Sequence, residues 1–183
     1  LTDVWIKDTL PSSGEATVDN PQVGLIDMNG EAGDGLAAAR GGIVEGTRLL
    51  VEGSHEMGIA ADGTDTVMTL TDLVVKDTHS CEGGMYVSGP LGENKSMAGN
   101  QGMGMMVRLE AHASITRGLF DNNKAIGLYA IFEGAVLELE DVEIRNTMER
   151  ECADPEHPNY ANCYLGEDAP SGAGIGLASF SGA

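Results

Sequence analysis

The stretch LTDVWIKDT (residues 1–9) decides the fold, because the chain repeats it twice. It returns as LTDLVVKDT at residues 70–78 and as LEDVEIRNT at residues 139–147, so successive copies start 69 residues apart. A fixed internal period is the signature of a repeat architecture, in which similar units stack on one another. The sequence therefore predicts a solenoid.

Each 69-residue unit contains a shorter internal repeat. ITRGLFDN (residues 115–122) aligns with LEDVEIRN (residues 139–146), and GTRLLVEG (residues 46–53) aligns with LTDLVVKD (residues 70–77). Each unit thus contains two related segments of about 23 residues and an extra stretch of about 20. Short alternating strands joined by Gly or Asx turns are typical of one coil of a parallel β-helix. We therefore expect an all-β parallel β-helix with coils of about 23 residues.

The alternation within each strand predicts which side chains point inward. The expected inward set is Val4, Ile6, Leu49, Val51, Leu70, Leu73, Val75, Ile115, Phe120, Leu139, Val142 and Ile144. All of them are apolar, and Gly118 takes the small position opposite Val142. The predicted core is a stack of aliphatic ladders.

Two outward columns, each made of one equivalent position in successive coils, alternate in charge. The first column is Asp3, Arg48, Asp72, Arg117 and Asp141, and the second, four residues further on, is Lys7, Glu52, Lys76, Asp121 and Arg145. Stacked coils lie about 4.8 Å apart, a distance at which opposite charges stabilise and like charges repel. The pattern predicts Asp72 beside Arg117 and Lys76 beside Asp121. A solvated face with signs set by chance is the alternative.

A third column contains only Asp, Asn and Gly. It consists of Asp8, Gly53, Asp77, Asn122 and Asn146. These residue types tolerate left-handed backbone and close turns with their own side chains. The column predicts a ladder of turns; a row of catalytic or calcium-binding carboxylates is the alternative.

The extra stretches are predicted to loop out of the stack, because the charge alternation makes Asp72 and Arg117 neighbours across them. They leave one corner after Thr9, Thr78 and Thr147 and are expected over about residues 10–34, 79–103 and 148–174. Long loops on a rigid scaffold are where binding usually resides. This corner is the expected functional face.

All three cysteines, Cys81, Cys152 and Cys163, lie in these loops. A Cys152–Cys163 disulfide is the first interpretation and implies an oxidising compartment, with Cys81 free or paired outside this chain. A Cys81–Cys152 bridge is the rival. A zinc site with His157 has suitable ligand types, but the spacing matches no strong template.

Two short acidic segments resemble fragments of calcium-binding loops. The candidate ligands are Asp27, Asn29, Glu31, Asp62 and Asp65. Neither segment supplies the full ligand series, so plain turns are favoured. No other cofactor is expected, and no catalytic residue is assigned.

The composition excludes several classes of function. With 29 acidic and 10 basic residues, the net charge of −19 argues against nucleic acid and against anionic membranes. Apolar residues make up 42% but aromatic residues only 4%, which favours a narrow core. Neither a membrane-spanning segment nor a signal peptide is visible. The chain starts within a repeat, so we expect it to be a piece of a longer protein.

Three segments carry a resemblance: VVKDT (residues 74–78), RGLFDN (residues 117–122) and GIGL (residues 174–177), the last preceded by the Cys152–Cys163 loop. Together they resemble right-handed parallel β-helix repeat proteins, in particular uncharacterised exported proteins of myxobacteria and related Gram-negative bacteria. The resemblance covers nearly the whole chain outside the loops. It implies a right-handed coil and export, with a lipoprotein anchor as one form. Pectate lyases and polygalacturonases share the architecture, but no matching motif carries their catalytic residues here.

Three hypotheses for function follow. The first is a non-enzymatic β-helix scaffold, secreted, periplasmic or on the outer surface of a Gram-negative bacterium, that binds a carbohydrate or a protein through its loops. The second is a polysaccharide lyase or glycoside hydrolase whose site spans several coils. The third is a filament-forming or assembly segment that associates end to end, because open solenoid ends expose unpaired backbone.

Overall fold

The computed structural model shows an all-β chain. The residues it describes are 1–9, 12–20, 24–32, 34–79, 84–89, 92–97, 102–148 and 174–180. Within these ranges the chain forms fourteen strands and no helix. The prediction of an all-β fold is therefore confirmed.

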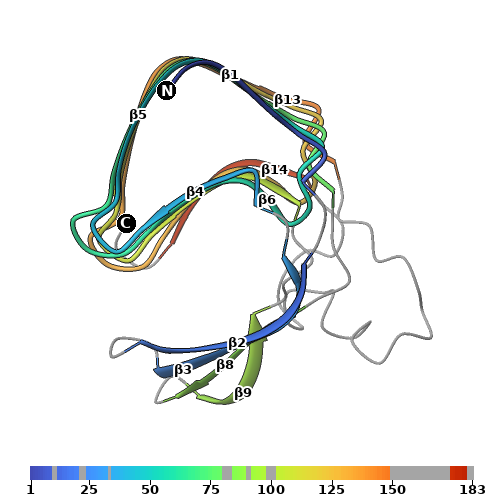
Figure 1. The fold of residues 1–183 in the computed structure, drawn as a ribbon, viewed down its shortest axis with the longest axis vertical. Helices are drawn as coiled ribbons and strands as arrows, with labels where there is room; N and C mark the ends of the chain where they lie inside the picture. Colours follow the sequence, from blue (N-terminus) through green and yellow to red (C-terminus); the bar gives the residue numbers. More distant parts are fainter. Residues whose placement is uncertain are drawn as a thin grey trace.

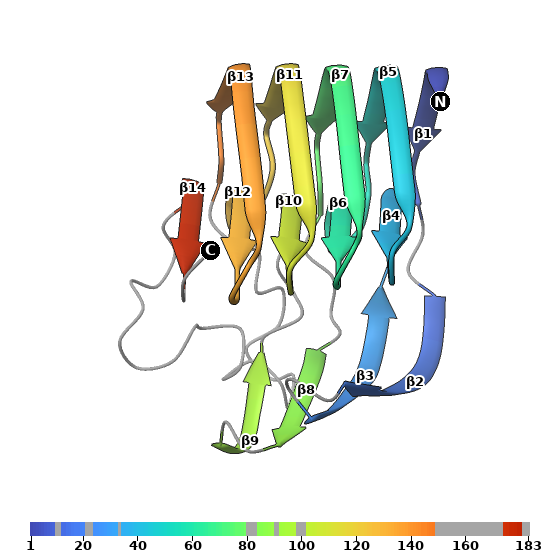
Figure 2. The same cartoon turned by 90° about the vertical axis from the view of Figure 1, so that its left-hand side faces the viewer.

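Two stacks of parallel strands build the solenoid. The first sheet runs in the order β1 (Thr2–Lys7), β5 (Ile43–Glu52), β7 (Val67–Lys76), β11 (His112–Asp121) and β13 (Val136–Arg145). The second runs in the order β4 (Leu36–Ala39), β6 (Met57–Asp62), β10 (Met103–Arg108), β12 (Ile126–Ile131) and β14 (Ile175–Phe180). Equivalent strands superimpose along the stack (Figure 1) and lie side by side when it is turned (Figure 2). The arrangement is that of a β-helix-like solenoid.

The strand register follows the sequence repeat. Val4 pairs with Leu49 and Leu49 pairs with Leu73, so neighbours are separated by 45 or by 24 residues. Leu70 in turn pairs with Ile115 across another 45 residues. Positions that are equivalent in the repeat are thus direct neighbours in the sheet.

The core forms between the two sheets. Among the predicted inward residues, Leu49, Val51, Leu70, Leu73, Val75, Ile115 and Phe120 are buried, and Val4, Ile6, Val142 and Ile144 pack against them. Leu139 differs, because it is 37% exposed. It lies on β13, which pairs with β11 alone in the first sheet, so one side of its strand has no covering neighbour there.

Left-handed backbone occurs at two columns of the first sheet, one within the strands and one just after their ends. The predicted turn column is left-handed throughout, with φ of 51° at Asp8, 69° at Gly53, 56° at Asp77, 55° at Asn122 and 51° at Asn146. The Asp/Arg column is left-handed as well, with φ of 53–56° from Asp3 to Asp141. The sequence did not predict this second bend, because arginine seldom adopts that conformation.

A separate antiparallel sheet lies beside the solenoid. It contains β2 (Ser12–Asn20), β3 (Gly24–Ala32), β8 (Gly84–Gly89) and β9 (Gly92–Met97), in that order. These strands fall within the first two stretches expected as loops, at about residues 10–34 and 79–103. The stretches therefore contain regular strands of their own, while residues 149–173 of the third lie outside the described ranges.

The second sheet is apolar on both faces. Met105 belongs to the main core, whereas Met106 belongs to a second buried cluster with Met57, Met103 and Ile126. Adjacent strand residues point to opposite faces, so this cluster lies on the outer side of the sheet. The antiparallel sheet is on the same side of the molecule (Figure 1).

Candidate functional site

The outward face of the first sheet carries the two charged columns. We call Asp3, Arg48, Asp72, Arg117 and Asp141 the Asp/Arg column, and Lys7, Glu52, Lys76, Asp121 and Arg145 the Lys/Glu column. The two columns lie four residues apart along each strand. The Asp/Arg column lies at the left-handed bend, and the Lys/Glu column lies one residue before the left-handed turn column.

The Asp/Arg column is held by paired hydrogen bonds between coils. Arg117 donates from Nε to Asp72 Oδ1 over 2.6 Å and from Nη2 to Asp72 Oδ2 over 3.0 Å. Arg48 makes the same two-point contact with Asp3, with 2.7 Å between Nη2 and Oδ2. Two parallel bonds fix the geometry of both side chains. The predicted neighbourhood of Asp72 and Arg117 is therefore present.

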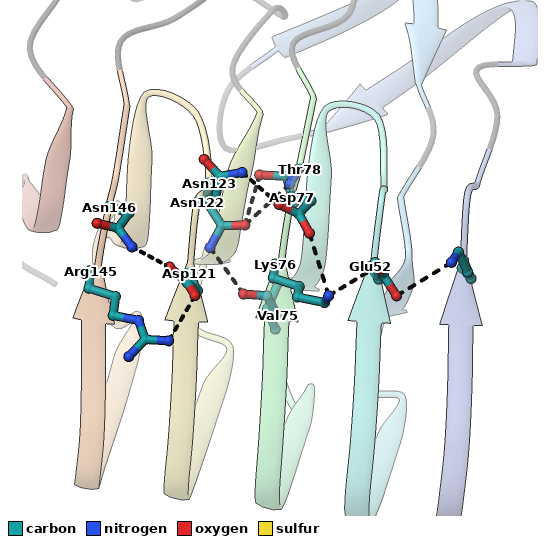
Figure 3. Close-up of polar contacts among 11 residues, drawn as sticks. Glu52, Val75, Lys76, Asp77, Thr78, Asp121, Asn122, Asn123, Arg145 and Asn146 are labelled. Carbon is teal, nitrogen blue, oxygen red and sulfur yellow. Dashed lines mark hydrogen bonds and ion pairs between the residues drawn. The ribbon is translucent and has the colours of Figure 1, made fainter.

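The Lys/Glu column is linked more loosely. Glu52 lies between two lysines, 3.7 Å from Lys7 Nζ and 3.0 Å from Lys76 Nζ. Further along, Arg145 Nη2 lies 3.0 Å from Asp121 Oδ2. Lys76 and Asp121 are register partners, but the Lys76 ammonium turns to Glu52 and to Asp77, 3.6 Å away (Figure 3).

These contacts keep the carboxylates ionised. The hydrogen bond from Arg48 lowers the pKa of Asp3, and that from Arg117 lowers the pKa of Asp72. Bonds from Lys76 and from Arg145 lower the pKa of Glu52 and Asp121, respectively. These four carboxylates therefore stay ionised to lower pH than free carboxyl groups do.

The turn column adds a ladder of amide bonds. Asn122 Nδ2 donates to Asp77 Oδ1 over 2.6 Å, and Asn146 Nδ2 donates to Asp121 Oδ1 over 2.8 Å (Figure 3). The bonds tie turns to neighbouring coils, which is a structural role. Within the described residues this column does not gather a set of unpaired carboxylates.

A buried polar network lies one residue further on. Asn123 Oδ1 accepts from the Thr78 hydroxyl over 3.0 Å, and Asn123 Nδ2 donates to the Val75 carbonyl over 3.2 Å. The Thr78 hydroxyl also bonds to the Gly102 carbonyl. Both side chains are 1% exposed, so the network closes the corner from which the excursions leave.

Two carboxyl groups, buried Glu56 and half-buried Asp34, lie where the chain returns to the second sheet. Burial raises the pKa of Glu56 to about 8, the charge of Asp34 adds to this, and Arg108 opposes it. Burial likewise raises the pKa of Asp34 to about 6. Arg108 itself is paired with Asp62, with 2.9 Å between Nη2 and Oδ2. Carboxyl groups with raised pKa values beside an arginine are suited to proton transfer.

Glu56 was not among the candidates predicted from the sequence. Its position in the repeat nevertheless differs from the equivalent positions in other coils, which hold small residues. Through the strand register, Glu56 is equivalent to Gly102 and Ala125. All three are left-handed, with φ of 77°, 60° and 56°. A buried glutamate in a strained position otherwise held by small residues is a recognised mark of functional sites.

The calcium candidates lie in two separate elements. Asp27, Asn29 and Glu31 lie in β3, in extended strand pairing rather than in a turn. Asp62 ends β6 and pairs with Arg108, and Asp65 lies in the turn that follows, with φ of 61°. Within the described ranges, no three His, Cys, Asp or Glu side chains could hold a metal ion.

The structure does not test the predictions about the cysteines. Cys81, Cys152 and Cys163 lie outside the described residues, as does His157. The disulfide and zinc alternatives therefore stay predictions.

No family model, no curated protein sequence and no solved structure matches the chain. In the part of the chain that the structure describes, no helix has the length and apolar character needed to cross a membrane. Function must therefore be argued from the sites themselves.

Proposed function

We propose that the protein is a non-enzymatic scaffold, secreted or at the cell surface, that presents the antiparallel sheet as a binding surface for a carbohydrate or a protein. The pairing of β3 with β8 carries this proposal. Leu25 pairs with Ser88 and Asn29 with Gly84, although β3 belongs to the first excursion and β8 to the second. Two excursions from different coils thus combine into one sheet that is separate from the two stacked sheets.

The solenoid has the properties of a support. The paired side chains of the Asp/Arg column fix one coil to the next, and the buried Thr78–Asn123 network fixes the corner where an excursion leaves. A rigid corner sets the spacing of the excursions and reduces the entropy lost on binding. These contacts support a presenting role.

We propose export to the periplasm or outer surface of a Gram-negative bacterium. The resemblance of residues 74–78 and 117–122 to exported β-helix repeat proteins supports this, and so does the net charge of −19. A right-handed coil and coils of about 23 residues belong to the same proposal.

Removing the excursions tests the scaffold proposal. We expect a variant with residues 10–33 and 80–101 replaced by Gly/Ser linkers to keep the strand-rich circular dichroism spectrum of the solenoid. It should lose binding to whichever glycan on a bacterial polysaccharide array, or whichever envelope protein, the intact chain retains. Arg145→Ala, on the first sheet, is the control and should keep binding. Undiminished capture by the shortened variant would refute the proposal.

A polysaccharide lyase or hydrolase is the second candidate, and the buried Glu56 favours it. Its strained backbone, raised pKa and proximity to Asp34 and Arg108 are features of an acid–base residue. Incubation with acidic and neutral polysaccharides, followed by measurement of reducing ends and unsaturated products, tests this role. Cleavage that is lost in Glu56→Gln would support an enzyme, and absence of cleavage on every substrate would remove this candidate.

A further inference from the structure

An apolar row runs between the two charged columns. It consists of Trp5, Leu50, Val74 and Leu119, which are register neighbours through the stack. Trp5 is 64% exposed, and the other three are half-buried on the outward face. Each row residue lies two positions from one column and two from the other, as Val74 does from Asp72 and Lys76. The row therefore forms the midline of a face bounded by charge on both sides.

The two columns carry opposite signs in every coil. The pairs are Asp3 with Lys7, Arg48 with Glu52, Asp72 with Lys76, Arg117 with Asp121, and Asp141 with Arg145. Five positive and five negative charges cancel, although the chain as a whole carries −19. Half of its ten basic residues lie here. The net negative charge thus belongs to residues outside the two columns, and of these only Glu143 lies on the row between them. The negative charge elsewhere on the molecule opposes association there.

We propose that this face, whose two columns carry no net charge, is the interface of a symmetric, side-by-side dimer with a second copy of the chain. A two-fold axis parallel to the stack and passing over the apolar row turns each Asp/Arg column onto the Lys/Glu column of the other copy. Because the signs are opposite in every coil, Asp72 then meets Lys76 of the second copy, and Arg117 meets Asp121. Each apolar residue meets its own equivalent on the axis.

Charge selects this orientation over the antiparallel one. A two-fold axis parallel to the strands would place the Asp/Arg column of one copy on the Asp/Arg column of the other, and likewise for the Lys/Glu columns. The order of the coils would be reversed between the two copies. Asp3 would then face Asp141 and Lys7 would face Arg145, which are like charges. The axis parallel to the stack opposes unlike charges in all five coils and leaves the contacts within each column in place.

The size of the face predicts weak association. Five coils about 4.8 Å apart and about five residues of strand at about 3.3 Å each give about 400 Å² per copy, or about 800 Å² in total. Interfaces of that size are transient, so we expect a dissociation constant on the order of 0.1 mM. Every further coil of the same pattern would enlarge the face.

The apolar row ends at Glu143, which is the register partner of Leu119. Glu143 is exposed and lies 3.3 Å from Arg145 Nη1. In the dimer it would approach Glu143 of the second copy, which weakens this end of the interface. Glu143→Leu should therefore tighten the dimer, and this gain cannot be explained by damage to the fold.

Sedimentation equilibrium of the purified chain, at concentrations up to roughly 1 mM, tests the proposal. We expect reversible dimers that dissociate as sodium chloride rises from about 0.05 to 0.5 M, because salt screens the charge pairs. Val74→Lys and Val74→Glu should each weaken the dimer about tenfold or more, since each places like charges on the axis. Mixing the two variants should restore it, because lysine then meets glutamate.

Ile43→Lys is the matched control. Ile43 is 72% exposed on the other limb of its bent strand, so the added charge should leave the dimer unchanged. A wild-type chain that stays monomeric throughout would overturn the proposal, and that is also the result expected if the face binds a different protein. Variants of Val74 that stay dimeric, a mixture that does not reassociate, or Glu143→Leu without tightening would each overturn it as well.

Discussion

Arg117 and Asp72 are 45 residues apart in sequence, yet they meet through two parallel hydrogen bonds of 2.6 and 3.0 Å. The contact requires that β7 and β11 be direct neighbours, and β8 and β9, which come between them in sequence, lie outside the two stacked sheets. This ion pair therefore forms only when the strands of the repeat unit stack in the observed order. Its partners are exposed, so it specifies register more than it stabilises the fold.

Arg117→Gln should raise the pKa of Asp72 toward its ordinary value. The hydrogen bond from Arg117 is the main cause of the lowered pKa, and its charge adds to the effect. Carbon-detected NMR titration of the Asp72 carboxyl group measures the shift. Arg145→Gln is the control, because it should raise the pKa of Asp121 and leave Asp72 unchanged. An Asp72 pKa that does not respond to Arg117→Gln would contradict the assigned contact.

Asn123→Ala should destabilise the corner by about 1–3 kcal/mol, because it leaves the Val75 carbonyl and the Thr78 amide without their buried partner. Chemical denaturation followed by circular dichroism measures the change. The control is Asn122→Gly, which keeps the left-handed backbone and removes a bond at the surface of the turn. We expect the control to lose clearly less stability than Asn123→Ala, and equal losses would argue against the buried network.

The stability of the fold should fall as pH rises from about 6 to about 8, because folding raises the pKa of Glu56 from 4.5 to about 8, whereas Asp34, with a pKa of about 6, contributes its slope at lower pH. In that range the folded state holds a proton that the unfolded state has released. Glu56→Gln should flatten this slope and be more stable than the wild type above pH 8. Thermal unfolding across pH measures both effects, with exposed Glu133→Gln as the control. A wild-type slope that persists in Glu56→Gln would assign the effect to another group.

Gly58→Ala should cost about 1–3 kcal/mol, because the added methyl group has no room. It would collide with Val75 Cγ1 and lie 2.6 Å from the Gly104 carbonyl oxygen. Gly176→Ala is a matched control at an equivalent position of the repeat, where the nearest atom lies 3.7 Å away. Thermal melts of the two variants should differ accordingly, and similar melting temperatures would show that the corner can expand.

Much of the stack could be predicted from sequence because its contacts repeat with the chain. Leu70 pairs with Ile115 because both occupy the same position of a repeated strand, and the alternation of Asp and Arg marks the neighbour. The left-handed turns at Asp77 and Asn122 were predictable from residue type alone. The bend at Asp72 was not, because its equivalent in the next coil is Arg117, whose side chain carries no turn signal.

The candidate sites depended on tertiary structure for a different reason. Glu56 is 8% exposed, and only the strand register shows that its equivalents are the small residues Gly102 and Ala125. The pairing of β3 with β8 joins two excursions of unlike sequence, whose meeting depends on where the solenoid places their ends. The period, the inward residues and the sign of each charge follow from the sequence, because they are local properties repeated in every unit. Which excursions combine, and which carboxyl groups lose water, follows from the three-dimensional arrangement, because it depends on distances set by the whole stack.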